Sequence, residues 1–328
     1  MALSMSIKSK VLELLERSRG ESVSGEFIAG QISVSRNAVW KAVGELRKDG
    51  YVIAAETNKG YCLSESNDIL SVQGMLPFFS NNNIAGNMHI YESLKSTNTT
   101  AKELAISGAE HGTIIIADHQ TAGKGRYGRS FFSPPGHGIY ISFILHPQIL
   151  GLESTPTMIT SYAAVAVCEA VEAATGKKPL IKWVNDVFLE GKKICGILTE
   201  AVTDFESGSM QWIVLGIGIN FATPEAGFPE EIKNTAGSVF INEKPTITRN
   251  RLTAELINRI LDTPEPSPDV LSKYKKRLLM LGKKVSVKGQ NGHYEATALD
   301  IDNIGRLIVE NNDGDRIVLD SGEISILM

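Results

Sequence analysis

Glycines alternate with basic residues in one short stretch of the chain, HQTAGKGRYGRS at positions 119–130. Gly125 stands between Lys124 and Arg126, and Arg129 adds a third cation three residues later. Glycine-rich backbone can close on a ligand through its N–H groups, while the cations complement a phosphate or a carboxylate. The spacing is not that of the phosphate loop GxxxxGK[ST]. Composition alone leaves an anion-binding loop and a flexible basic surface loop equally open.

A second polar cluster, KWVND at 182–186, is followed by KKICG at 192–196. Apolar runs flank a turn at 190–191, which predicts a hairpin. Lysine can act as a point charge on phosphates, and the oxygens of Asn185 and Asp186 are the hard ligands that Mg²⁺ prefers. A solvated β-turn explains the same residues, so this string alone does not distinguish a phosphate and Mg²⁺ site from a turn.

Three further patterns are weaker. Ser96, Thr97 and Asn98 precede the helical run TAKELAIS, and taken alone they are best explained as its N-cap. The residues GIGIN at 216–220 do not form GxGxxG, which argues against a Rossmann site. Their glycines permit close backbone approach at a strand end, or only a bulge. The six histidines show no HExxH spacing and the chain has no GxSxG motif, so zinc-hydrolase and serine-hydrolase functions lack support.

The first 65 residues predict a winged helix-turn-helix domain. A first helix from Ile7, a short helix capped by Ser24, a tight turn and a long helix capped by Ser35 precede a hairpin at 51–64. In such a domain the helix after the turn enters the major groove of DNA. Its outward residues suit phosphates and base edges, and they are Arg36, Asn37, Trp40 and Lys41. A protein-interaction module is the alternative.

The rest of the chain predicts two further domains. After an expected linker at 66–84, extended runs alternate with helices expected at 155–176, 248–261 and 272–281, the last preceded by a proline-rich connection at 263–269. Many strands lie close together without an intervening helix, so the sheet is mixed or antiparallel. Five short strands near the C-terminus predict a small barrel or sandwich. The fold class is therefore α+β, with domains at 1–65, 66–280 and 281–328.

The overall composition restricts the class of protein. The chain has 328 residues, and its 33 Lys and Arg against 37 Asp and Glu leave a net charge of −4. This balance excludes a basic coat over the whole surface, though not a local basic face for nucleic acid. Three widely spaced cysteines form no disulfide framework, and no window approaches the roughly 18 apolar residues of a membrane span. We expect a cytoplasmic protein with no membrane partner.

Taken together, six strings in one order resemble the biotin protein ligases, specifically the bifunctional class that is also the biotin operon repressor. The strings are ESLKSTN, QTAGKGRYGR, KWVND, KKICGILTE, GIGIN and GEISIL, and they follow a winged helix. The resemblance covers nearly the whole chain. It implies that biotin and ATP, with Mg²⁺, form biotinyl-5′-adenylate, and that biotin then passes to a lysine of a biotin carboxyl carrier protein. It also implies a homodimer, promoted by ligand, on operator DNA.

The resemblance also implies roles for individual residues. Those expected to bind biotin are Ser96, Thr97, Asn98, Gln120, Lys124, Gly125, Arg126, Lys193 and Gly196. Lys193 and Arg126 are the expected catalytic residues, because they would stabilise charge on the carboxylate and the α-phosphate. ATP would be bound by Lys182, Asn185, Asp186, Arg129 and Asn220, with Asp186 as the expected Mg²⁺ ligand. Neither step needs a Ser or Cys nucleophile, which agrees with the missing triad motifs.

The chain departs from the family pattern at three positions. Lys124 stands where many members have arginine, which replaces a bidentate fork by a point charge. Val184 replaces the proline of KWPND, and Tyr127 occupies a position that is often basic. Three alternatives stay open: a lipoate ligase of the same catalytic fold, a ligand-sensing transcription factor with weak or lost ligase activity, and a working ligase whose winged helix no longer regulates transcription.

Overall fold

The computed structural model describes eight segments of the chain, and it divides into two compact units. The segments are residues 6–56, 59–147, 149, 156–203, 210–262, 268–289, 292–320 and 322–327. The predicted turn residue 58 and most of the proline-rich connection at 263–269 lie outside them. The first unit is Met1–Ile90 with Ile247–Asn258, and the second is Tyr91–Thr246 with Arg259–Met328. The division into three domains at 65 and 280 stays a prediction.

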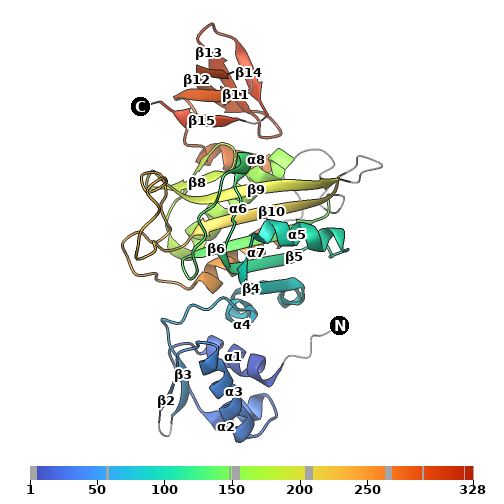
Figure 1. The fold of residues 1–328 in the computed structure, drawn as a ribbon, viewed down its shortest axis with the longest axis vertical. Coiled ribbons are helices and arrows are strands. Elements are labelled where there is room, and N and C mark those ends of the chain that lie inside the picture. The colour runs from blue at the N-terminus through green and yellow to red at the C-terminus, as the bar shows by residue number, and fades with distance from the viewer. Residues whose placement is uncertain are drawn as a thin grey trace. The chain divides into compact units, whose positions relative to one another are not determined.

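The first unit contains the expected winged helix-turn-helix (Figure 1). Its elements are α1 (Ile7–Arg17), β1 (Ser22–Val23), α2 (Gly25–Gln31), α3 (Arg36–Lys48), β2 (Ile53–Glu56) and β3 (Gly60–Leu63). Ser24 and Ser35 accept hydrogen bonds from the backbones of α2 and α3, as expected of N-caps. Aliphatic side chains of the three helices and the hairpin share one buried core. β1 pairs with β3 and is too short to leave a sequence pattern.

The stretch 66–84, expected to be a linker, is folded within the first unit. It contains α4 (Val72–Met75), the 3₁₀ helix η1 (Leu76–Phe78) and the first part of η2 (Asn82–Asn87). Ser71 caps α4 by accepting a hydrogen bond from Gly74 N. These turns are too short to show helical periodicity, which is why the sequence predicted only a connection.

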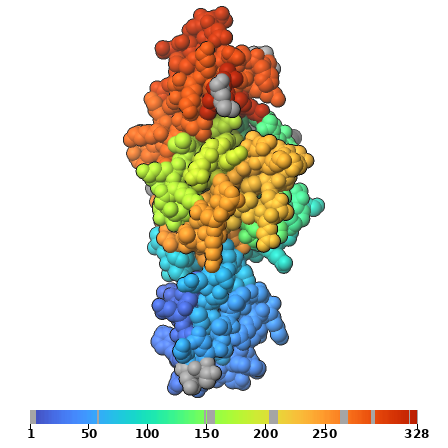
Figure 2. Space-filling model, turned by 90° about the vertical axis from the view of Figure 1, so that its left-hand side faces the viewer, coloured from blue at the N-terminus to red at the C-terminus, as the bar shows by residue number. Residues whose placement is uncertain are grey.

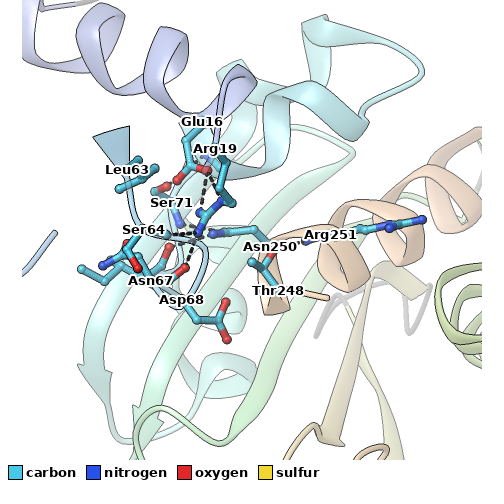
Figure 3. A network of polar contacts seen from close by, with 12 residues as sticks. Glu16, Arg19, Leu63, Ser64, Asn67, Asp68, Ser71, Thr248, Asn250 and Arg251 are labelled. Atoms are coloured by element: carbon cyan, nitrogen blue, oxygen red, sulfur yellow. Dashed lines mark hydrogen bonds and ion pairs between the residues drawn. The ribbon is translucent and has the colours of Figure 1, made fainter. Parts of the chain in front are cut away.

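A network of polar contacts joins this stretch to the winged helix and to the start of α7 (Arg249–Asp262) (Figure 3). Arg19 donates to the Glu16 carboxylate and to the backbone carbonyl of Asn67. Arg249 donates to Asp68, which lies 181 residues earlier in the chain. No local spacing rule links residues so far apart, so these contacts have no signature in the sequence.

The central sheet has seven strands in the order β4-β5-β6-β10-β9-β8-β7. They are β4 (Met88–Leu94), β5 (Thr113–Gln120), β6 (Gly138–Leu145), β7 (Leu180–Lys182), β8 (Asp186–Leu189), β9 (Lys192–Thr203) and β10 (Met210–Asn220). Across the sheet from β5 through β6, β10, β9 and β8 to β7, each strand runs antiparallel to its neighbour, as the closely spaced strands predicted. α5 (Thr97–Ile106) packs on β5, β6 and β10, and in Figure 1 it lies in front of the sheet.

The helix expected from 155 to 176 is α6 (Pro156–Thr175), which packs on β7 to β10. Among the described residues, its segment Thr157–Thr175 alone has the length and hydropathy to cross a membrane. Of that segment, 67% is buried inside the fold. Core helices of folded domains have the same properties, so the segment is weak evidence for a span.

The last five strands form one antiparallel sheet, in the order β14-β13-β12-β11-β15. They are β11 (Lys284–Gly289), β12 (Gly292–Ile301), β13 (Leu307–Asn311), β14 (Arg316–Leu319) and β15 (Glu323–Ile326), orange to red in Figure 2. Within the described residues no pairing joins β14 to β15, so the expected barrel is not closed. As expected, the sheet contacts the central part of its unit: the indole of Trp183 donates to Gly305 O at 3.0 Å.

The basic helix α8 (Pro268–Arg277) begins before the expected residue 272 and ends before the expected residue 281. Its last predicted turn leaves the helix because Leu278 bridges to Ile181 of β7, and Leu279 N donates to the Ile181 carbonyl. The backbone there completes the edge of the central sheet, a tertiary contact that helical periodicity cannot anticipate.

Candidate functional site

A cavity of about 380 Å³ lies within the second unit and collects nearly all the residues singled out from the sequence. The predicted residues that line it are Ser96, Thr97, Asn98, Gln120, Lys124, Gly125, Arg126, Arg129, Lys182, Asn185, Asp186, Lys193 and Gly196. Asn220 is not among them. It lines a neighbouring hollow of about 100 Å³ that shares Lys193 and Phe131 with the cavity. The side-chain amide of Asn220 donates to Gly237 O at 2.8 Å.

The glycine-rich loop forms an ordered hairpin at the cavity. Gly125 N donates to Arg129 O at 2.7 Å, and Phe131 N donates to Gly123 O at 2.9 Å. A side chain at Gly123 is excluded, because its Cβ would stand 2.5 Å from Phe131 O. Between these bonds, Arg126 donates from Nη1 to Asn185 Oδ1 at 3.1 Å, which joins the loop to the KWVND turn. Of the two interpretations, the structure supports a loop that faces a ligand site.

Cations concentrate where the loop meets the KWVND hairpin. Lys193 Nζ lies 2.6 Å from Asp186 Oδ1, across the β8–β9 pair. Burial lowers the pKa of Lys182 despite the nearby charge of Asp186, since a desolvated ammonium is less stable. Several positive charges on fixed supports form a site for anions such as phosphate and carboxylate. Asp186 supplies one carboxylate here, and the described residues contain no cluster of three His, Cys, Asp or Glu that could hold a metal.

The start of α5 brings uncharged polar groups to the same cavity. Ser96 occupies the N-cap position, but its side chain makes no capping hydrogen bond, so capping alone does not account for it. Gln120 Oε1 accepts Thr97 N–H at 2.8 Å, and Gln120 Nε2 donates to Ser133 Oγ at 2.9 Å. Asn98 is 4% exposed and is bonded on both sides of its amide. This part of the cavity can recognise a neutral polar group through directed hydrogen bonds.

The GIGIN glycines work as the sequence suggested, by close backbone approach. A Cβ on Gly216 would stand 2.0 Å from Asn98 Oδ1, and one on Gly218 would stand 2.5 Å from the Phe131 ring. Both neighbours line the cavity. The glycines of β10 therefore make room for the residues that form its wall.

Sequence reasoning missed several residues of the site. Ser142 bonds both Thr97 and Asn98, and its signal was a single polar letter within the buried run GIYISFIL. Gly322 to Ser325 belong to the string GEISIL, which carried the resemblance but was given no role in the site. They line the cavity from the C-terminal sheet, and Glu323 forms an ion pair with Arg129. No local pattern could place those residues beside a loop nearly 200 positions earlier.

The residues predicted to read DNA lie together on the exposed face of α3. Arg36, Asn37, Trp40 and Lys41 are all exposed, and Trp40 is 62% exposed. The opposite face of α3 is buried in the core of the winged helix. An exposed indole beside two cations is a surface that suits a nucleic-acid backbone and base edges.

Three family models match successive parts of the chain. They are an HTH domain at residues 8–62, the Biotin/lipoate A/B protein ligase family at residues 90–220, and the Biotin protein ligase C terminal domain at residues 280–327. Together they follow the winged helix, the central sheet with its cavity, and the last five strands.

Curated relatives match over nearly their whole length. The bifunctional ligase/repressor BirA of Bacillus subtilis is 36% identical over 315 residues, which cover 94% of this chain and 95% of that protein. The protein of the same name from Escherichia coli is 28% identical over 326 residues, covering 97% and 96%. Among solved structures, a biotin protein ligase from Aquifex aeolicus in complex with biotin and ATP has a TM-score of 0.62 at 26% identity, covering 74% of this chain and 98% of that one.

Proposed function

We propose a function for this chain from the premise that it belongs to the bifunctional ligase/repressor BirA family. The chain is a biotin protein ligase that activates biotin with ATP and attaches it to a carrier protein, and it is a DNA-binding repressor through its helix-turn-helix. The observation that carries the ligase function is one cavity that combines directed neutral hydrogen bonds with a cluster of cations.

The cations suit the chemistry of activation. A carboxylate that attacks the α-phosphate of ATP forms a mixed anhydride and releases pyrophosphate, so negative charge gathers on phosphate oxygens. Preorganised cations stabilise that charge without reorganising. In our proposal Lys193 and Arg126 have this role, because Asp186 holds the first and Asn185 holds the second. Lys182, with its pKa lowered by burial, adds charge on the ATP side.

The neighbouring hollow suits part of the nucleotide. Phe132 and Phe228 meet there edge to face, with ring centroids 6.3 Å apart, and Asn220 lies beside them. An apolar, aromatic hollow next to the cations can hold a base while its phosphates reach Lys193. This arrangement supports a role for Asn220 in nucleotide binding from outside the main cavity.

Mg²⁺ enters this proposal as part of the substrate Mg·ATP. It is bound in proteins through one or two carboxylates together with substrate phosphates. Asp186 offers one such carboxylate at the cavity, and the remaining ligands would come from the triphosphate and water. The donor set therefore fits a metal brought by the nucleotide better than a resident ion.

A transfer assay tests the ligase function. The protein is incubated with biotin, Mg·ATP and a biotin carboxyl carrier protein, and the intact mass of the carrier is measured. We expect one biotinyl group on the carrier and none when its acceptor lysine is replaced by arginine. Modification by lipoate instead of biotin would identify a lipoate ligase, and no modification with either acid would favour a sensor without ligase activity.

We further propose that ligand promotes a homodimer that binds operator DNA. Two α3 helices related by a two-fold axis would fit the two half-sites of a palindrome. Sedimentation and gel-shift measurements with and without biotin plus ATP test this coupling. We expect dimerisation and DNA binding to rise together with ligand. DNA binding that ignores the ligand would contradict the coupling and leave a ligase with an uncoupled winged helix.

A further inference from the structure

A row of polar contacts runs from the cavity into the sheet behind it. Asn98 lies directly against Gly216 of β10, which Ser142 of β6 and Leu198 of β9 flank in register. Asn98 Oδ1 is 2.6 Å from Ser142 Oγ. Asn98 Nδ2 donates to Glu200 Oε2 at 2.8 Å and, at a longer 3.3 Å, to Leu198 O. The amide therefore spans three strands, with an oxygen contact on one side and a carboxylate on the other.

Glu200, which is not among the residues that line the cavity, carries a charge into this row. Lys102 Nζ, one turn along α5 from Asn98, lies 2.5 Å from Glu200 Oε1. Burial by itself raises the pKa of Glu200, but the hydrogen bonds from Lys102 and Asn98, together with the charges of Lys102 and Lys124, outweigh it and hold that pKa below its usual value. The carboxylate is therefore ionised at neutral pH, and an ionised carboxylate only accepts hydrogen bonds.

The Glu200 carboxylate sets the direction of the hydrogen bonds among Asn98, Ser142 and Thr97. Asn98 must turn its NH₂ toward Glu200, which turns its oxygen toward Ser142. Ser142 has one proton and Asn98 Oδ1 has none, so Ser142 donates to Asn98. Ser142 Oγ also donates to Thr97 Oγ1 at 2.7 Å, so its one proton is shared between Asn98 Oδ1 and Thr97 Oγ1. Thr97 Oγ1 in turn donates its own proton to Gln120 Oε1, at a longer 3.2 Å.

As a result, the cavity wall presents a hydrogen-bond acceptor, and not a donor, at Thr97. Thr97 Oγ1 has given its proton to Gln120, so it meets a ligand as an acceptor through its remaining lone pair. Thr97 lines the cavity. An acceptor held in this way suits a ring N–H donor, such as those of a cyclic urea.

We propose that Glu200 and Lys102 are positioning residues that set the direction of the chain Asn98–Ser142–Thr97, and that this direction selects a ligand with ring N–H donors. The inference rests on the proposed biotin-binding function, because biotin carries such a urea. Neither residue touches the substrate. Their effect passes through Asn98, whose amide is buried and fully bonded.

The test compares two ligands by calorimetry: biotin, and its cyclic carbonate analogue, in which oxygen replaces both ring N–H groups. The variant is Glu200→Gln, whose amide can present either a donor or an acceptor to Asn98. We expect biotin to bind Glu200→Gln roughly 10- to 100-fold more weakly, the range for one misdirected buried hydrogen bond. We also expect the wild-type preference for biotin over the carbonate to shrink by a similar factor. Ser142→Ala should lower the preference too.

Controls separate this inference from a general loss of structure. Glu103→Gln removes a carboxylate from the exposed side of the same helix and should leave both affinities unchanged. Lys102→Arg should retain the preference, and Lys102→Met should reduce it. If Glu200→Gln weakens both ligands equally or changes neither, the inference is wrong. If the wild-type protein binds no biotin at all, the proposed function itself fails.

Discussion

Replacement of Gly216 by alanine should strongly weaken biotin binding while leaving the rest of the fold intact. The new Cβ would stand 2.0 Å from Asn98 Oδ1 and 2.7 Å from its Cγ, in the middle of the sheet where the backbone cannot shift easily. Asn98 must move, and it then loses its short bonds to Ser142 and Glu200. Two buried polar contacts left unmade cost about 3 kcal/mol, which corresponds to a roughly 100-fold weaker Kd.

Titration calorimetry with biotin measures this effect directly, and thermal unfolding reports the accompanying loss of stability. Gly44→Ala is the matched control, because no atom outside its own helix lies within 4 Å of its added Cβ and alanine favours the interior of α3. We expect the control to bind biotin as the wild type does. A Gly216→Ala variant with unchanged biotin affinity would refute the argument that Asn98 must lie on this glycine.

Three further predictions concern the remaining parts of the protein. Lys193→Ala should lower biotin-dependent pyrophosphate exchange at least roughly 100-fold, since removing one preorganised charge donor has effects of this size, and unchanged exchange would exclude its catalytic role. Arg36→Ala and Asn37→Ala should weaken operator binding in gel shifts while ligation stays intact, and equal losses of both activities would argue against base readout. Biotin affinity should stay constant from pH 8 to about 5 and should decrease once the pH is below 4.5, the usual carboxyl pKa. The reason is that the lowered pKa of Glu200 keeps this carboxylate ionised above that pH. Calorimetry across this pH range checks the prediction, and a loss of affinity near pH 6 would contradict it.

The local elements of this protein are largely readable from the sequence. Ser24 and Ser35 marked helix starts because capping depends on a single residue and its near neighbours. The hairpin around Glu190 followed from a turn between two apolar runs, and Glu190 indeed adopts a positive φ there. Such features depend on contacts within a few residues of the chain, so the local sequence is enough to predict them.

The features that could not be predicted from the sequence depend on long-range contacts. Glu200 pairs with Lys102 across 98 residues, and Glu323 meets Arg129 from another sheet. Charged side chains on a strand are usually solvated, and nothing in the spacing of these residues indicates an ion-pair partner. The same reason explains the expected linker at 66–84, because its bonds to the start of α7 close over about 180 residues.

Biotin-dependent exchange of labelled pyrophosphate into ATP tests the central claim most directly. It requires only the cavity, biotin and Mg·ATP, and it is independent of any carrier protein or DNA. We predict rapid exchange with biotin and none with lipoate or without an acid. Exchange that is absent with biotin, in protein shown to be folded, would contradict the assignment of this cavity to biotin activation.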